Sequence, residues 1–171
     1  PKRVLDIGTG SGCIAVSLAL EAPQAEVSAW DVAPEAIIQA QENADQLGAK
    51  VALKQQDVFD WEQETNTWDI IVSNPPYVLD AEKSEMESHV LDHEPHLALF
   101  VPNEDPLKFY RVIGEMAQKR LMPGGFLCFE INRSLGAENV ALAEKQGFEN
   151  IQLLKDFHGN DRMLIAQKSA H

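Results

Sequence analysis

Segments with the character of buried β-strands alternate with segments of helical period along the chain. Apolar, β-branched stretches predict the strands, and apolar residues three or four positions apart predict the helices. We expect strands at residues 3–7, 26–31, 51–53, 68–73, 126–131, 151–154 and 163–166, and helices at residues 13–20, 34–47, 106–121 and 137–145. This order predicts an α/β fold with a mostly parallel, seven-stranded sheet and helices on both faces. The last strand is expected to be antiparallel, because a hairpin-type turn at residues 158–161 joins the final pair.

A glycine-rich turn follows the first strand. Residues 8–12 read Gly-Thr-Gly-Ser-Gly and lead directly into the first helix, which is how a nucleotide-binding βα unit opens. Glycines let the backbone approach a ligand closely, and the N–H groups at a helix start point toward it. A dinucleotide-binding Gly-x-Gly-x-x-Gly would need glycine at Cys13, and no Gly-Lys-Ser or Gly-Lys-Thr of a Walker loop follows. The pattern alone leaves a nucleotide site and a simple glycine-rich turn equally open.

Acidic residues follow the second and third strands. Asp31 comes about 20 residues after the glycines, where nucleotide-binding α/β folds place the carboxylate that accepts hydrogen bonds from a ribose. Asp57 follows the third strand, although an isolated aspartate in such a place is more often a loop cap than a ligand. The carboxyl ends of parallel strands meet at one edge of a sheet, so we expect both residues to lie beside the glycine turn.

The fourth strand ends abruptly in Asn74-Pro75-Pro76-Tyr77. Neither proline can donate to a sheet, each fixes φ, and Pro76 holds Pro75 extended, so the backbone is stiff here. The side-chain oxygen of Asn74 and the carbonyl of Pro75 are two acceptors, with the Tyr77 ring beside them. A flat group carrying an NH2 could donate one hydrogen to each acceptor and lie against the ring. For the isolated motif, a Pro-Pro turn with a capping Asn is the alternative. Here the glycine turn, Asp31, Asp57 and Asn74 follow four successive strands at one edge of the sheet, and this agreement favours a binding site.

Charge and composition restrict the partners. The 171 residues carry a net charge of −13, and the only close basic pairs are residues 2–3 and 119–120, so nucleic acid is not expected as the main partner. No stretch approaches the length of a bilayer-spanning helix, and we expect a cytoplasmic protein without a membrane partner.

Cys13 and Cys128 lack paired spacing and are expected to be reduced core residues, and the five histidines lack metal-ligand spacing. The chain starts with a strand and without Met, so a preceding segment is expected in the natural protein.

The chain resembles the class I S-adenosylmethionine-dependent methyltransferases, and more narrowly the protein-glutamine methyltransferases of the HemK/PrmC type. That family modifies the glutamine in the Gly-Gly-Gln loop of peptide-chain release factors. The resemblance rests on residues 4–12, 72–77, 94–95 with 98–99, 155–156, 159 and 161–162. Asn-Pro-Pro-Tyr by itself is shared with enzymes that methylate the exocyclic amino group of adenine, so segments 94–95 and 161–162 decide between the two families.

The resemblance implies a Rossmann-like class I methyltransferase domain over residues 1–171. It implies S-adenosylmethionine as cofactor, S-adenosylhomocysteine as product and a release factor as protein substrate. Cofactor binding is then expected from Asp6, Gly8, Thr9, Gly10, Ser11, Gly12, Asp31, Asp57, Val58 and Asn74. Substrate binding is expected from Asn74, Pro75, Pro76 and Tyr77, of which Asn74, Pro75 and Tyr77 are the catalytic residues. The N-terminal helical domain with which the family binds release factors is expected to be missing.

Two other functions stay open. One is methylation of the exocyclic amino group of adenine in RNA or DNA, and the other is an inactive cofactor-binding module that acts in protein interaction. Asn132 and Leu135 stand where the family tends to have glycine and glutamine, which leaves details of substrate binding open. Residues 78–104 lose regular period and are expected to form a lid or binding segment with exposed histidines.

Overall fold

A seven-stranded sheet forms the centre of the molecule, in the spatial order β3-β2-β1-β4-β7-β9-β8. The computed structural model describes residues 1–76, 78–79, 100–101 and 105–171. The strands of the sheet are β1 (Arg3–Ile7), β2 (Glu26–Asp31), β3 (Val51–Gln55), β4 (Trp68–Ser73), β7 (Leu121–Glu130), β8 (Glu149–Lys155) and β9 (Asp161–Gln167). Strands β1, β2, β3, β4 and β7 pair in parallel, whereas β9 is antiparallel to both β7 and β8. The predicted fold class is confirmed.

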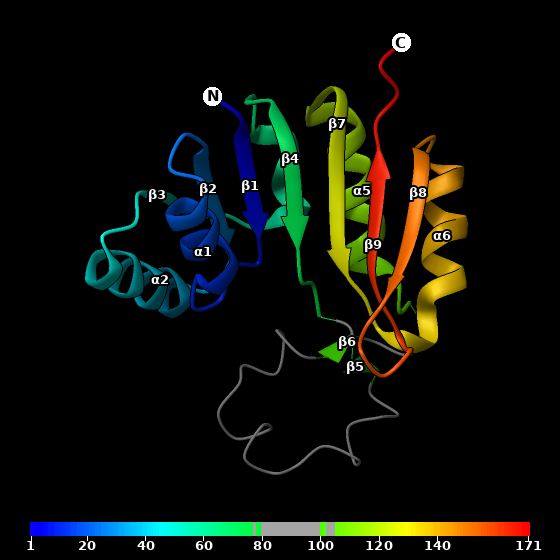
Figure 1. Ribbon diagram of the computed structural model, residues 1–171, viewed down its shortest axis with the longest axis horizontal. Coiled ribbons are helices and arrows are strands. Elements are labelled where there is room, and N and C mark those ends of the chain that lie inside the picture. Colours follow the sequence, from blue (N-terminus) through cyan, green and yellow to red (C-terminus); the bar gives the residue numbers. More distant parts are fainter. Residues whose placement is uncertain (77, 80–99, 102–104) are drawn as a thin grey trace.

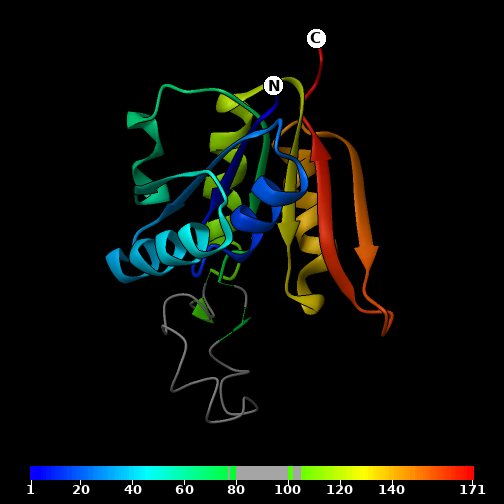
Figure 2. The same ribbon diagram turned by 60° about the vertical axis from the view of Figure 1, so that its left-hand side comes forward.

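Helices cover both faces of the sheet (Figures 1 and 2). Helices α1 (Cys13–Glu21) and α2 (Pro34–Leu47) pack against β1, β2 and β3 on one face, and α5 (Lys108–Arg120) and α6 (Gly136–Lys145) pack against β7, β8 and β9 on the other. The larger hydrophobic core lies under α5 and includes Leu5, Ile71 and Tyr110, all fully buried. Two short 3-10 helices, η1 (Val58–Gln63) and η3 (Arg133–Leu135), were not predicted.

The boundaries of α2 match the prediction because local signals define both ends. Pro34 stands in the first turn, where its fixed φ suits a helix and its missing N–H has no intrahelical partner to lose. Gly48 ends the helix with a left-handed φ of 70°, and its N–H donates to the carbonyls of Ala44 and Asp45.

The start of α5 differs from the prediction. The helix was expected to begin at residue 106, but it begins at Lys108 with Leu107 as N-cap. The Asp105 carboxylate instead accepts two hydrogen bonds, of 2.7 and 2.9 Å, from the Arg111 guanidinium, and this interaction lowers the pKa of Asp105. Asp105 therefore forms an ion pair with the first turn of the helix instead of capping it.

Strand β7 starts five residues earlier than the expected residue 126, at Leu121. Residues 122–125 were expected to belong to neither helix nor strand, but this Met-Pro-Gly-Gly segment continues the strand with a shift in register against β4. Gly124 donates its N–H to the carbonyl of Lys168 over 3.1 Å, and the Lys168 N–H donates to Gly125 over 2.9 Å. The residues after β9 thus pair with a segment that lacks strand propensity.

Strands β5 (Val78–Leu79) and β6 (Phe100–Val101) form a small parallel sheet inside the segment expected to be irregular, and the rest of that segment, with the expected lid and histidines, lies outside the described residues. Both cysteines are free thiols, but Cys13 is exposed on the first turn of α1, so its prediction as a core residue is wrong. No described helix is long and apolar enough to cross a membrane.

Candidate active site

The carboxyl ends of β1, β2 and β4 meet at one edge of the sheet, the lower edge in Figure 1. The order of the strands places β1 between β2 and β4. The chain proceeds from β1 outward to β2 and β3, then returns to the other side of β1 to form β4. In open α/β sheets, ligands bind outside the carboxyl ends of the strands at such a reversal point. The predicted site residues lie at or just after the ends of these three strands and of β3.

The glycine turn is held against the end of β2. The N–H groups of Gly8 and Thr9 both donate to the carbonyl of Trp30, over 2.8 and 2.9 Å. Gly8 and Gly10 have left-handed φ values of 73° and 58°, and a Cβ added at either residue would meet no atom within 4 Å. Their missing side chains therefore leave open space over the backbone rather than room for a neighbouring helix.

Gly12 has a different role from the two glycines before it. Its φ is 83°, and an added Cβ would lie 2.9 Å from the Cβ of Ala40 and 3.2 Å from its Cα. Ala40 is a buried residue of α2, so Gly12 allows the start of α1 to pack closely against α2. Ser11 is exposed, and its carbonyl accepts a hydrogen bond of 2.8 Å from the Asn43 side chain.

Asp31 supports the glycine turn directly. Its Oδ2 accepts from the N–H of Gly10 over 2.8 Å, and its Oδ1 accepts from the N–H of Ala33 over 3.0 Å. The carboxylate is therefore fixed in position by backbone groups. Each carboxylate oxygen has a second lone pair, so Asp31 can still accept hydrogen bonds from two hydroxyl groups of a ligand.

Asp6 is buried beneath the same turn, with 1% of its surface exposed. Burial raises the pKa of Asp6 to about 7, although a hydrogen bond of 2.7 Å from the Thr9 hydroxyl to its Oδ2 acts in the opposite direction. Among the described residues Oδ1 has no partner in hydrogen-bonding geometry, while the nearby N–H of Ala15 also favours the charged form. A positive charge nearby would further favour ionisation of this carboxyl group.

The end of β4 is tied to the end of β1. The buried Ser73 hydroxyl donates to the carbonyl of Ile7 over 2.7 Å. Asn74 follows as an exposed residue, Pro75 is buried and Pro76 is half-buried. The segment that carries the Asn74 acceptor is thus anchored on both sides, by Ser73 and by a buried proline. Tyr77 lies outside the described residues, and its predicted role stays a prediction.

One pocket brings most of the predicted residues together. Its polar wall contains Gly8, Gly10, Asp31, Asp57 and Asn74, and the two prolines after Asn74 complete this side. Its apolar wall is formed by Ile7, Val32, Ala36, Val58, Phe109 and Ile113. The predicted residues Asp6, Thr9, Ser11 and Gly12 are not part of the lining.

Asp57 combines both roles that the sequence left open. Its Oδ1 accepts a hydrogen bond of 2.9 Å from the N–H of Phe59, so it caps η1. It also lies in the pocket lining next to Val58. The cap fixes the carboxylate at the pocket wall.

Comparison with known proteins assigns the family. The model of the methyltransferase small domain matches residues 1–95 of the chain. The chain belongs to the methyltransferase small domain family. This methyltransferase domain is 51% identical over 168 residues to the release factor glutamine methyltransferase of Bacteroides thetaiotaomicron, covering 98% of the chain and 60% of that relative. It is 50% identical over 162 residues to the protein of the same name from Flavobacterium psychrophilum, covering 95% of the chain and 57% of that relative. The chain thus spans about 60% of the length of these relatives.

Solved structures of other methyltransferases share the fold of this methyltransferase domain. A methyltransferase from Pyrococcus furiosus superposes with a TM-score of 0.71 at 21% identity, covering 98% of this chain and 75% of the other. The 16S rRNA N2 G1207 methyltransferase RsmC of Thermus thermophilus, described in complex with AdoMet and guanosine, gives a TM-score of 0.69 at 24% identity, covering 98% of this chain and 37% of the other.

Apart from Val58, the apolar wall of the pocket was not predicted from the sequence. Phe109 and Ile113 come from α5, far along the chain, and Ile113 also fits the helical period expected of an ordinary core residue. The one local sign of this wall in the sequence is Phe109, an apolar residue of α5 that precedes the buried Tyr110 and is not itself one of the fully buried residues of the helix. Ser73 was likewise missed, because a serine at the end of a strand has no distinctive pattern.

Proposed function

We propose that this domain transfers a methyl group from S-adenosylmethionine to the side-chain amide nitrogen of the glutamine in the Gly-Gly-Gln motif of peptide-chain release factors. The observation that carries the proposal is the shared pocket: Asn74 and Pro75 border the same cavity as Gly8, Gly10 and Asp31. Two hydrogen-bond acceptors for an amide NH2 therefore lie beside residues that suit the binding of a nucleoside.

The pocket residues fit the proposed cofactor. Asp31 is a fixed acceptor that suits the two ribose hydroxyls. The apolar side chains of Val32, Val58 and Phe109 suit the faces of an adenine ring. The open backbone at Gly8 and Gly10 leaves room for the amino-acid part, and the buried Asp6 carboxyl group, whose Oδ1 has no hydrogen-bond partner among the described residues, lies beneath the glycine turn. When bound, S-adenosylmethionine supplies the methyl group on a positively charged sulfonium.

Asn74 and Pro75 would orient the substrate. An amide nitrogen is a weak nucleophile because its lone pair is delocalised into the carbonyl group. Hydrogen bonds from its two N–H groups to the Asn74 side-chain oxygen and the Pro75 carbonyl would hold the nitrogen toward the cofactor side of the pocket and stabilise positive charge that develops on it. Pro75 and Pro76 keep both acceptors in place before the substrate arrives.

The relatives support the choice of substrate. The similar proteins from Bacteroides and Flavobacterium are named release factor glutamine methyltransferases, and their identity to this chain is about 50% over almost its whole length. The net charge of −13 is unfavourable for a nucleic-acid substrate and favourable for a basic protein surface. Translation termination takes place in the cytoplasm, so the proposal places the protein there.

The test uses unmodified release factor and S-adenosylmethionine. The chain is incubated alone, and also joined to the region that its longer relatives carry outside the aligned part, and methylated peptides are mapped by mass spectrometry. We expect a methyl group on the Gly-Gly-Gln glutamine. If both versions bind the cofactor and neither modifies the release factor, the proposal is wrong, and adenine-containing nucleic acids become the next substrates to test.

A substitution at Asn74 then tests the assigned role. Asn74→Ala should reduce methyl transfer about 100-fold or more, because one fixed acceptor in the transition state is lost. Its cofactor affinity, measured by calorimetry, should stay within a few-fold of the unchanged protein. Asn66→Ala is the matched control, because Asn66 is an exposed asparagine just before the opposite end of β4. Loss of cofactor binding in Asn74→Ala, or full activity, would contradict the assignment.

A further inference from the structure

The hairpin between β8 and β9 carries a fully exposed aromatic side chain. Phe157 lies at the turn of this hairpin with a relative exposure of 108%, the largest among the exposed apolar residues of the described chain. An aromatic side chain of this size contributes strongly to protein association when a partner buries it.

The turn around Phe157 has a defined conformation. The Asp156 Oδ1 accepts from the N–H groups of His158 and Asn160 over 2.9 and 3.0 Å, and the Asp156 N–H donates to the Asn160 carbonyl over 2.9 Å. The Arg162 guanidinium lies 3.4 Å from the other Asp156 oxygen. The hydrogen bond from Asn160 is the main cause of a lowered pKa for Asp156, so the carboxylate stays charged at neutral pH. Phe157 is therefore presented by an ordered loop.

The base of the hairpin is attached to the segment after β7. The Ile131 N–H donates to the Arg162 carbonyl over 2.8 Å, and Lys155 forms an ion pair of 2.9 Å with Asp161. A Cβ added at Gly136 would overlap Asp161 Oδ2, which shows how closely the hairpin base packs against the start of α6. The hairpin is thus fixed relative to the sheet.

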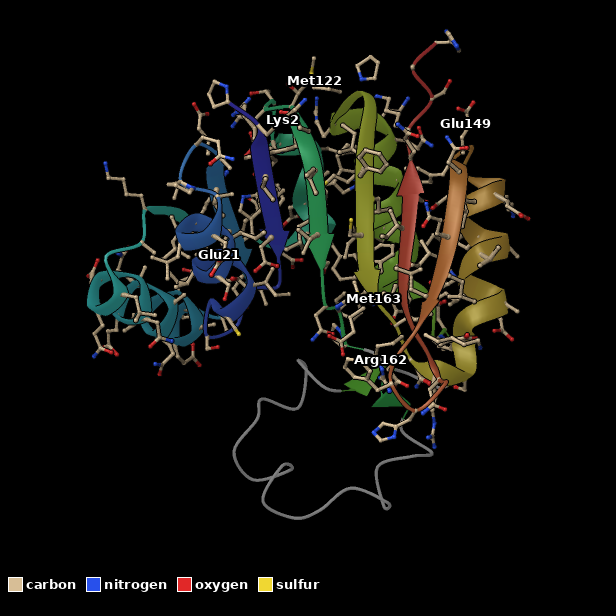
Figure 3. All side chains as sticks on the ribbon, in the orientation of Figure 1. Lys2, Glu21, Met122, Glu149, Arg162 and Met163 are labelled. Atoms are coloured by element: carbon tan, nitrogen blue, oxygen red, sulfur yellow. The ribbon has the colours of Figure 1, made fainter. Side chains whose placement is uncertain are left out.

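The hairpin lies at the same edge of the sheet as the proposed active site. Figure 3 shows Arg162 and Met163 at the edge where β1, β4 and β7 end. Arg162 and Met163 line a largely apolar hollow together with Ser73, the residue before Asn74. β9 is two strands away from β4 in the sheet, which corresponds to about 10 Å at the usual strand spacing.

A protein substrate must cover this region. A typical interface buries about 800 Å² on each partner, which corresponds to a patch with a radius of about 16 Å if it is circular. A folded protein that places a glutamine at Asn74 would therefore extend over the base of the hairpin. A short peptide bound at Asn74 need not reach it.

We propose that the β8–β9 hairpin is a docking element for the protein substrate, with Phe157 inserting into an apolar recess on the release factor near its Gly-Gly-Gln loop. This inference rests on the proposed function. Aromatic residues, Phe included, are enriched in protein interfaces, and a contact residue contributes most when it is held in place before binding. The hydrogen bonds of Asp156 provide that order. The remote contact adds affinity for the whole protein without contacting the reacting amide.

The test compares two substrates, whole release factor and a short peptide that contains its Gly-Gly-Gln loop. Phe157→Ala should raise the KM for the whole release factor about tenfold or more, as expected for loss of an aromatic anchor. The KM for the peptide, and kcat for both substrates, should stay within twofold. Phe157→Tyr should restore most of the affinity, because it keeps the aromatic surface. Leu47→Ala removes another exposed apolar side chain, 60% exposed, from α2, which packs against β3 at the other side of the sheet from β8, and should change neither KM.

The outcomes separate this inference from the proposed function. If the unchanged protein methylates release factor and Phe157→Ala has the same KM for it, the hairpin is not a docking element, and the proposed function stands. If the unchanged protein methylates neither substrate, the proposed function fails and the inference fails with it. If Phe157→Ala instead changes self-association of the chain in sedimentation measurements and leaves KM unchanged, Phe157 belongs to a contact between copies, which overturns the inference.

Discussion

The close approach of α1 and α2 at Gly12 leads to a quantitative prediction for Gly12→Ala. The added methyl group would lie 2.9 Å from the Cβ of Ala40 and 3.2 Å from its Cα, a backbone atom that can move only if α2 moves. Such overpacking costs about 1–3 kcal/mol. The left-handed φ of 83° adds about 1–2 kcal/mol for a residue with a Cβ. We therefore expect Gly12→Ala to lower the free energy of unfolding by about 2–5 kcal/mol.

Gly48→Ala is the matched control. Gly48 has a similar φ of 70°, but a Cβ added there meets no atom within 4 Å. Only the conformational cost of about 1–2 kcal/mol should appear in this variant. The effect of replacing glycine on the unfolded chain is common to both variants and cancels in their difference. The difference of about 1–3 kcal/mol therefore measures the contact with Ala40.

Urea denaturation followed by circular dichroism gives both free energies. The double variant Gly12→Ala/Ala40→Gly removes the Cβ of residue 40 that the new methyl group would meet. Ala40→Gly by itself lowers the free energy of unfolding by about 1 kcal/mol through its poorer helix propensity. After this cost is allowed for, the double variant should recover most of the stability lost through the contact between the two Cβ atoms. Equal losses for Gly12→Ala and Gly48→Ala, or strictly additive effects in the double variant, would show that Gly12 is not required for helix packing.

Two further changes test the attachment of the site to the sheet. Ser73→Ala should lower the free energy of unfolding by about 1–3 kcal/mol in denaturation experiments, because the Ile7 carbonyl loses its buried hydroxyl donor. The control Ser17→Ala, at an exposed position of α1, should change the free energy of unfolding by no more than about 0.5 kcal/mol. Asp6 binds a proton more tightly in the folded protein, with a pKa of about 7 against 3.8, so its contribution to stability should be lost as pH rises from about 4 to 7. Asp6→Asn should flatten that part of the stability profile, and an unchanged slope would contradict the raised pKa.

The sequence predicted the parts of the site that depend on one strand end each. Glycines after β1, Asp31 after β2 and Asn74 after β4 have local signals, and parallel strands bring such residues to one edge. The same reasoning predicted β9 as antiparallel, because residues 158–161 form a short turn between two apolar runs.

The features that the sequence did not predict depend on partners distant in the chain. Asp105 has the local pattern of an N-cap, but Arg111 competes for its carboxylate. The segment at Gly124 is held in the strand by hydrogen bonds with Lys168, which lies 44 residues further along the chain. The apolar wall at Phe109 becomes part of the pocket only when α5 packs beside the strand ends, and no local pattern specifies that arrangement.

The position of the pocket at the reversal point of the sheet has a consequence for folding. Gly8, Gly10 and Asp31 belong to the first half of the fold, and Asn74 and Phe109 to the second. The Ser73–Ile7 hydrogen bond that joins the halves spans 66 residues of sequence. Contacts with such separation pay a large loop-closure entropy and tend to form late. The complete pocket, in which Asn74 and Phe109 lie opposite the glycine turn, is therefore assembled only when both halves have come together. A bound ligand selects the completed fold and stabilises it by mass action.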